Sequence, residues 1–173
     1  MTQSLKEHLV SAFDEIQVDI PEKDRILIHV KKETILSMLS FLKDRGYTHL
    51  GLISCVDWID KKVFELVYIL SAYMQNDAKY TDNEKINIIL KTRIPRDNAV
   101  FLSVIPIFEN AEPYEREIHE LFGIHFEGHP RLTPLFLERE YEIPPFRKDF
   151  DTRKYVEDVF DTIPMIEKKT GNP

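Results

Sequence analysis

The sequence has a single cysteine, Cys55, among its 173 residues. One thiol excludes an internal disulfide bond. It also excludes an iron–sulfur cluster bound by this chain alone, because such clusters take several thiolate ligands. With only five glycines, the chain also has no Gly-rich motif that would cradle a phosphate-bearing cofactor. We therefore expect this chain to carry no cofactor.

Long apolar runs and an excess of basic residues are missing as well. No run approaches the roughly 20 apolar residues of a membrane-spanning helix, and the N-terminus lacks the pattern of a signal peptide. The net charge of −7 argues against a nucleic-acid surface, which needs clustered Lys and Arg. These absences predict a cytoplasmic chain with no nucleic-acid partner and no direct membrane span. Any association with a membrane would be peripheral and made through a partner.

The composition that is present, 43% hydrophobic and 31% charged, is that of one globular domain. Apolar residues at helical spacing predict helices over 5–13 and 33–45. Alternating or continuous apolar residues predict strands over 16–20, 26–30, 49–56, 63–72 and 85–93. A polar loop is expected over 75–83. Strands joined by short turns favour an α+β fold, with an antiparallel or mixed sheet and helices packed on one face.

The stretch 113–130 is predicted to begin as a helix. Pro113 suits the first helical position, where its missing N–H costs nothing. Gly123 suits the left-handed position that ends a helix. The apolar residues that form one stripe are Tyr114, Ile118, Leu121 and Phe122. On the opposite side we expect Arg116 and Glu120 to form a surface ion pair, which contributes only a few tenths of a kcal/mol.

From residue 131 on, prolines interrupt any regular pattern, so we expect an extended C-terminal arm over 131–150. A short helix is expected over 153–161. The division is thus 1–130 as the α+β domain and 131–173 as arm and terminal helix of the same unit. The arm carries more apolar residues than a free loop exposes to water. It is therefore expected to pack partly on the domain and partly on a neighbouring protein.

Two groups of side chains could form a metal site or a catalytic site. His119, His125 and His129 lie near acids at 115, 117 and 120, and such a set could hold zinc. The helix end between the histidines separates them, however, so surface or hydrogen-bonded histidines are the favoured interpretation. The three glutamates could serve as general acid and base, but the sequence supplies no nucleophile or substrate pocket beside them.

Two further motifs have a structural and a binding interpretation. Asp57-Trp58 could form a binding platform, although a Trp at a strand end more often lies in the core. Arg147-Lys148-Asp149 is too short for a nucleic-acid patch. We expect Arg147 and Lys148 to meet carboxylates or backbone carbonyls of a partner, since the guanidinium group offers a fork of donors.

These motifs also carry a resemblance. E-R-E at 115–117, L-F-G-I-x-F-x-G-H-P at 121–130 and R-K-D-F at 147–150 resemble the signature of the 30-kDa (C-type) subunit of respiratory complex I. Related membrane-bound hydrogenases and other complex-I-like oxidoreductases share that family. The resemblance implies a subunit of an NADH:quinone oxidoreductase or of a ferredoxin-driven hydrogenase or sulfur-reducing complex, attached peripherally to the inner face of the cell membrane.

The resemblance also implies the partners of such a subunit. They would be the large catalytic subunit and adjacent iron–sulfur subunits, which hold the iron–sulfur clusters and a quinone or nickel–iron site. The residues implied at the partner interface are Glu115, Arg116, Glu117, Gly128, His129, Pro130, Arg147, Lys148 and Asp149. No catalytic residue, cofactor ligand or metal ligand is expected in this chain. Two alternatives stay open, namely a stand-alone enzyme with a His/Glu metal site and a regulatory binding module.

Overall fold

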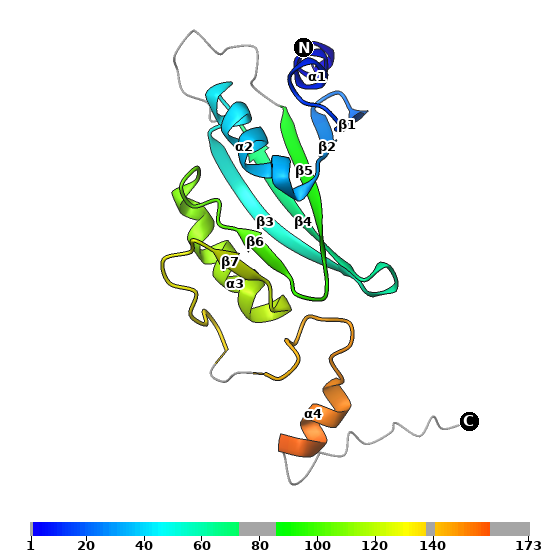
Figure 1. Ribbon diagram of the computed structural model, residues 1–173, viewed down its shortest axis with the longest axis vertical. Helices are drawn as coiled ribbons and strands as arrows, with labels where there is room; N and C mark the ends of the chain where they lie inside the picture. The colour runs from blue at the N-terminus through cyan, green and yellow to red at the C-terminus, as the bar shows by residue number, and fades with distance from the viewer. Residues whose placement is uncertain (1, 73–85, 138–140, 160–173) are drawn as a thin grey trace, which may run out of the picture.

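A computed structural model describes residues 2–72, 86–137 and 141–159 (Figure 1). The first half contains α1 (Thr2–Ala12), β1 (Gln17–Glu22), β2 (Arg25–His29), the short 3₁₀ helix η1 (Lys32–Thr34), α2 (Ile35–Asp44), β3 (His49–Trp58), η2 (Ile59–Lys61) and β4 (Val63–Ser71). The second half contains β5 (Asn87–Pro95), β6 (Val100–Leu102), η3 (Glu109–Ala111), α3 (Glu112–Phe122), β7 (His125–Glu127) and α4 (Thr152–Val159). The predicted helices and strands are present, with ends shifted by a few residues. The predicted loop over 75–83 and the ends of two predicted elements, residue 85 and residues 160–161, lie outside the described residues.

The main sheet has five strands in the order β1-β2-β5-β4-β3. β2 pairs with β5 in parallel, and the other neighbours are antiparallel. The predicted α+β fold with a mixed sheet is therefore confirmed. In Figure 1, α2 lies across this sheet, and α3 lies beyond β3, at the edge opposite β1.

One face of the sheet holds the core. Side chains alternate along a strand, and on β4 the residues Phe64, Leu66, Tyr68 and Leu70 are all fully buried. They pack with the apolar sides of α1, α2 and α3 in one continuous cluster. Of the residues between them on β4, Val67 and Ile69 are only half-buried, whereas Glu65 is buried beside its ion-pair partners Lys91 and Arg93. The sheet thus has a covered face and an open face.

The second sheet was not predicted. β6 pairs with β7 in parallel, with Phe101 opposite Phe126, and both phenylalanines are buried. Each strand has only three residues, which is too short to show an alternating pattern. β7 lies inside the signature stretch, where the sequence indicated extended chain, but its partner strand is decided by the tertiary fold.

The signature helix α3 follows its prediction closely. It begins at Glu112, so Pro113 occupies the first turn. Ile118 and Leu121 are buried, and Tyr114 and Phe122 pack partly buried against the core. Gly123 ends the helix with φ of +78°, a left-handed conformation that glycine adopts without strain.

The arm after α3 is extended in its described part. Residues 131–137 and 141–151 contain neither helix nor strand, and α4 follows. Among the helices in the described part of the chain, none has the length and apolar character needed to cross a bilayer.

Candidate functional site

The first glutamate of the E-R-E motif points into the core. Glu115 is fully buried, and its Oε1 accepts a hydrogen bond of 2.6 Å from the Val104 N–H. Its other oxygen, Oε2, has no hydrogen-bond partner in the described chain. Burial raises the pKa of Glu115 to about 7, and the hydrogen bonds from Val104 and Ser103 oppose that increase. The Glu115 side chain therefore fixes the loop after β6 to α3.

The buried position does not fit the predicted role of Glu115 at a partner interface. A side chain with no exposed surface offers nothing for a partner to contact, so we expect Glu115 to act inside the domain. The reason is helical geometry: Glu115 precedes the buried Ile118 by three residues and so lies on the same side of α3. The sequence pattern predicted the apolar stripe of α3, but it did not predict that Glu115 lies on the same side of the helix.

The outer side of α3 holds the first part of the arm. The Arg116 guanidinium donates to the carbonyl oxygens of Thr133 and Pro134, at 2.9 and 2.8 Å. The Glu120 carboxylate accepts hydrogen bonds from the backbone N–H groups of three consecutive residues, Leu135, Phe136 and Leu137. We call Arg116 and Glu120 the helix clamp. Because charged partners strengthen hydrogen bonds to the backbone, the clamp fixes residues 133–137 on the helix.

The predicted ion pair between Arg116 and Glu120 is therefore wrong. Arg116 pairs instead with Glu112, one turn earlier, with Nη1 3.3 Å from Oε1. The prediction considered only neighbours within the helix. In the folded chain, carbonyl and N–H groups of the arm lie beside these two charges and form hydrogen bonds with them instead.

The R-K-D-F motif holds the later part of the arm against the main sheet. The buried Asp57 side chain accepts two hydrogen bonds from Arg96, at 3.0 and 3.2 Å. Asp57 also accepts one of 2.8 Å from the Lys148 N–H. Arg96 bridges onward to Asp149, which in turn pairs with Arg147 through two contacts of 3.1 Å. We call these five residues the sheet clamp.

The charges in the sheet clamp shift one another's protonation. Hydrogen bonds from Arg147 and Arg96 hold the pKa of Asp149 well below its usual range. Hydrogen bonds to Asp149 and Asp57 raise the pKa of Arg96 further above its usual value. Arg96 is a site residue that the sequence did not reveal, because it follows a strand in a stretch without periodicity.

Pairing of Arg147 and Lys148 with a partner protein stays a prediction, although the Arg147 side chain and the Lys148 backbone bind within the chain. One expectation in this region needs correction. Trp58 was expected to lie in the core, yet 36% of its surface is exposed. The Lys61 and Lys148 ammonium groups lie 4.8 and 6.0 Å from the centre of its ring. Trp58 follows the inward-pointing Asp57, so alternation along β3 turns it outward.

Apolar contacts complete the docking of the arm. The Phe146 N–H donates to the Leu121 carbonyl at 3.0 Å, and the Phe122 and Phe146 rings meet edge to face with centroids 5.9 Å apart. A Cβ atom at Gly123 would lie 3.0 Å from Cγ of Pro144. Gly123 is thus required twice, for its positive φ and for the close approach of the arm.

Two of the three histidines, His119 and His129, bind backbone groups. His119 Nδ1 lies 2.9 Å from the Ile124 carbonyl oxygen. His129 lies between the Glu112 carbonyl and the Arg131 N–H, and so braces the G-H-P turn. In the described residues, no group of three His, Cys, Asp or Glu side chains lies close enough to hold a metal ion. Of the other expected interface residues, Gly128 and Pro130 are exposed and Glu117 is half-buried.

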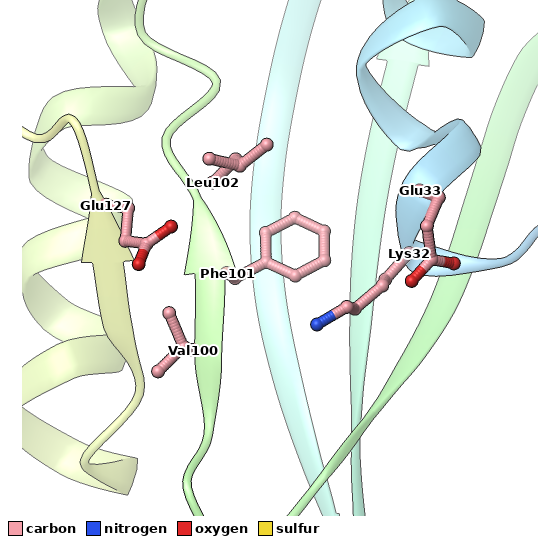
Figure 2. Close-up of a pocket in the computed structure, with 6 residues that line it drawn as sticks. All are labelled: Lys32, Glu33, Val100, Phe101, Leu102 and Glu127. Carbon is pink, nitrogen blue, oxygen red and sulfur yellow. The ribbon is translucent and has the colours of Figure 1, made fainter.

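A pocket of about 230 Å³ lies between β6 and the start of α2. Figure 2 shows its lining, in which Phe101 points toward the 3₁₀ turn that carries Lys32 and Glu33, while Glu127 approaches from β7. The remaining lining residues are Val100 and Leu102. These side chains include no nucleophile activated by a base, so the pocket does not suggest a reaction.

Comparison with known proteins gives the family. The model of the family described as "Respiratory-chain NADH dehydrogenase, 30 Kd subunit" matches residues 28–156. The C-type subunit of the F(420)H(2) dehydrogenase of Methanosarcina mazei is 32% identical over 151 residues, which cover 86% of this chain and 89% of that relative. The C-type subunit of the NADH-quinone oxidoreductase of Agrobacterium fabrum is 30% identical over 142 residues, which cover 80% of this chain and 66% of that relative.

Solved structures agree on the fold. A chain of the membrane-bound sulfane sulfur reductase, an archaeal respiratory membrane complex, superposes with a TM-score of 0.82 at 24% identity, over 99% of this chain and 98% of that chain. The trypsin-resistant fragment of Nqo5 gives a TM-score of 0.63 at 21% identity, over 76% of this chain and 100% of the fragment.

The family model and the relatives confirm the resemblance carried by the sequence motifs. The chain belongs to the 30-kDa subunit family of complex-I-like respiratory oxidoreductases.

Proposed function

We propose that this chain is a cofactor-free structural subunit of a membrane-bound complex-I-like oxidoreductase, and that it docks on the large catalytic subunit with the outward side of its arm. The proposal rests mainly on one observation. The two clamps fix the arm, yet they leave two of its large apolar side chains in solvent, Phe136 at 67% exposed and Phe146 at 61%. Apolar side chains that are both exposed and held in place are typical of protein interfaces.

Fixing the arm beforehand would favour such docking. A segment that is ordered before binding loses less conformational entropy when it meets its partner. The signature motifs would then act indirectly: Arg116, Glu120 and Asp149 position the arm, and the exposed apolar side chains make the contact. Of the residues expected at the interface, Glu117, Gly128, His129, Pro130, Arg147 and Lys148 remain candidates for direct contact.

The chemistry of the chain supports a role without a cofactor. Its one thiol, Cys55, is buried, and burial followed by the nearby Asp57 charge raises the pKa of Cys55. A buried thiol of raised pKa is a poor nucleophile and a poor metal ligand. Iron–sulfur clusters and a quinone or nickel–iron site would belong to partner subunits on the cytoplasmic side of the membrane. The electron donor and acceptor depend on those subunits.

Co-purification tests the docking. The tagged chain is expressed with its neighbouring subunits, and the variant Phe136→Ser/Phe146→Ser is expected to lose the large subunit, with binding at least about tenfold weaker. Val10→Ser is the matched control, since Val10 is 55% exposed on α1, away from the arm. Normal assembly of the double variant, with an unchanged melting temperature, would reject the arm as the interface.

A separate measurement tests the absence of a cofactor. Elemental analysis and visible absorbance of the purified chain are expected to show neither bound metal nor a chromophore. About one metal ion per chain, lost in a His125→Ala/His129→Ala variant, would favour the metal-enzyme alternative instead.

A further inference from the structure

The open face of the main sheet carries a continuous apolar row. The strand register places Leu27, Ile89, Ile69 and Leu52 side by side across four strands. All four side chains point away from the helices, and all are half-buried or exposed. A sheet with one solvated face normally presents polar residues there. A row of four aliphatic side chains is therefore unusual for a face in contact with water.

A second apolar line runs along the edge strand β3. Leu52, Val56 and Trp58 point to the open face, with 39%, 37% and 36% of their surfaces exposed. β3 pairs only with β4 among the described strands. The row and the line meet at Leu52, so the apolar surface is L-shaped and reaches the edge of the sheet.

The charges near Val56 and Trp58 on this face are mostly positive, whereas the exposed Asp19 lies in register with Leu27 at the opposite side of the sheet. Glu65 lies in register between Val56 and Arg93, and the two cations Lys91 and Arg93 both pair with it, at 3.6 and 2.7 Å. At the far end, the Lys61 and Lys148 ammonium groups lie near the ring of Trp58. The chain as a whole has a net charge of −7. The β3 side of this face thus carries charge of the opposite sign from the protein as a whole.

We infer that the open face, defined by Leu27, Leu52, Val56, Trp58, Ile69, Ile89, Lys91 and Arg93, is a second protein-docking surface that binds a polypeptide with an apolar patch edged by carboxylates. Charge complementarity selects this occupant. A second copy of the chain stacked about a two-fold axis would bring the cations of one face toward those of the other, which is unfavourable. Lys148 belongs to the sheet clamp and also lies near Trp58, so the open face is adjacent to the docked arm.

This inference extends the proposed function, because a subunit with two docking surfaces joins two neighbours. It does not depend on which surface binds the large subunit. Trp58 is the only tryptophan of the chain and serves as a local probe. Hydroxyl-radical oxidation, read by mass spectrometry, reports its accessibility in the free chain and in the assembled complex.

We expect oxidation of Trp58 to be several-fold slower in the assembled complex. We also expect Arg93→Glu, and separately Val56→Ser, to weaken retention of one co-purifying subunit by about tenfold while the arm-dependent contact persists. Val10→Ser again serves as the control, and melting curves show that each variant is folded. Two variants of different chemistry are used because Arg93→Glu also removes a partner of Glu65.

Three outcomes would overturn the inference. Equal oxidation of Trp58 in the free and assembled states would show that no neighbouring protein covers the face, and it would leave the arm proposal intact. Concentration-dependent protection of Trp58 with dimers in sedimentation would assign the face to a second copy. Binding of the free chain to phosphatidylglycerol vesicles, lost in Arg93→Glu, would assign it to an anionic membrane surface.

Discussion

Glu115 and Glu120 belong to the same helix, α3, but they work on opposite sides of it. Glu115 is fully buried and accepts one backbone hydrogen bond from the core loop. Glu120 faces the arm and accepts hydrogen bonds from three consecutive backbone N–H groups. The difference shows how one signature helix serves two tasks: its inner side joins the helix to the domain, and its outer side holds the segment proposed to meet a partner.

The largest effect is expected from protonation of Glu115. Its folded pKa of about 7 lies above the usual value of 4.5, so the folded state binds more protons than the unfolded state between these pH values. Stability should therefore fall as pH rises through this window, by on the order of 3 kcal/mol from this group. Chemical denaturation at pH 5 and pH 8 measures this difference.

Glu115→Gln tests the assignment, because the amide keeps an acceptor for the Val104 N–H and does not titrate in this range. The variant should flatten the pH dependence between pH 5 and pH 8. An unchanged slope would place the titrating group elsewhere in the protein.

On the arm side, the strongest effect should come from Asp57→Ala. The change leaves the mostly buried Arg96 with Asp149 alone and removes the acceptor of the Lys148 N–H. Loss of one partner from a buried charge network is expected to cost about 2 to 3 kcal/mol, measured by chemical denaturation. Asp60→Ala, in the neighbouring η2 turn, is the control and should change stability little.

Glu120→Ala should release the arm without unfolding the domain. We expect global stability to fall by about 1 kcal/mol or less, while trypsin cleaves after Arg131 markedly faster than in the unaltered chain. Glu117→Ala is the matched control, as a glutamate of the same helix. Unchanged cleavage with Glu120→Ala would mean that the sheet clamp alone holds the arm.

Arg147→Ala should have the smallest effect, about 0.5 kcal/mol or less, since Arg96 still pairs with Asp149 at this partly exposed site. The effect should be complete at neutral pH and should disappear once Asp149 is protonated. The lowered pKa of Asp149 means that its contribution is complete above the usual aspartate range and is lost as pH falls through the folded pKa. The variant should thus lose stability at a slightly higher pH than the unaltered chain, as followed by acid titration of the circular dichroism signal.

Sequence patterns predicted the regular elements well, for a physical reason. The helices and long strands bury one side against one core, and that burial imposes a period that can be read from the residues alone. α3 shows this best: its apolar stripe and Gly123 appear in the structure as predicted. The motif residues also indicated the family, since three motifs in fixed order are specific.

The partners of the charged residues were decided by the tertiary structure alone. Arg116 and Glu120 had a plausible partner in each other, and only the return of the arm along α3 gave them backbone groups instead. Arg96 became a site residue because the end of β5 meets Asp57 and Asp149, which are far away in the sequence. β6 and β7 pair for the same reason. Helical and strand periods are local, whereas a hydrogen bond or an ion pair depends on which distant segments the folded chain brings within about 3 Å of one another.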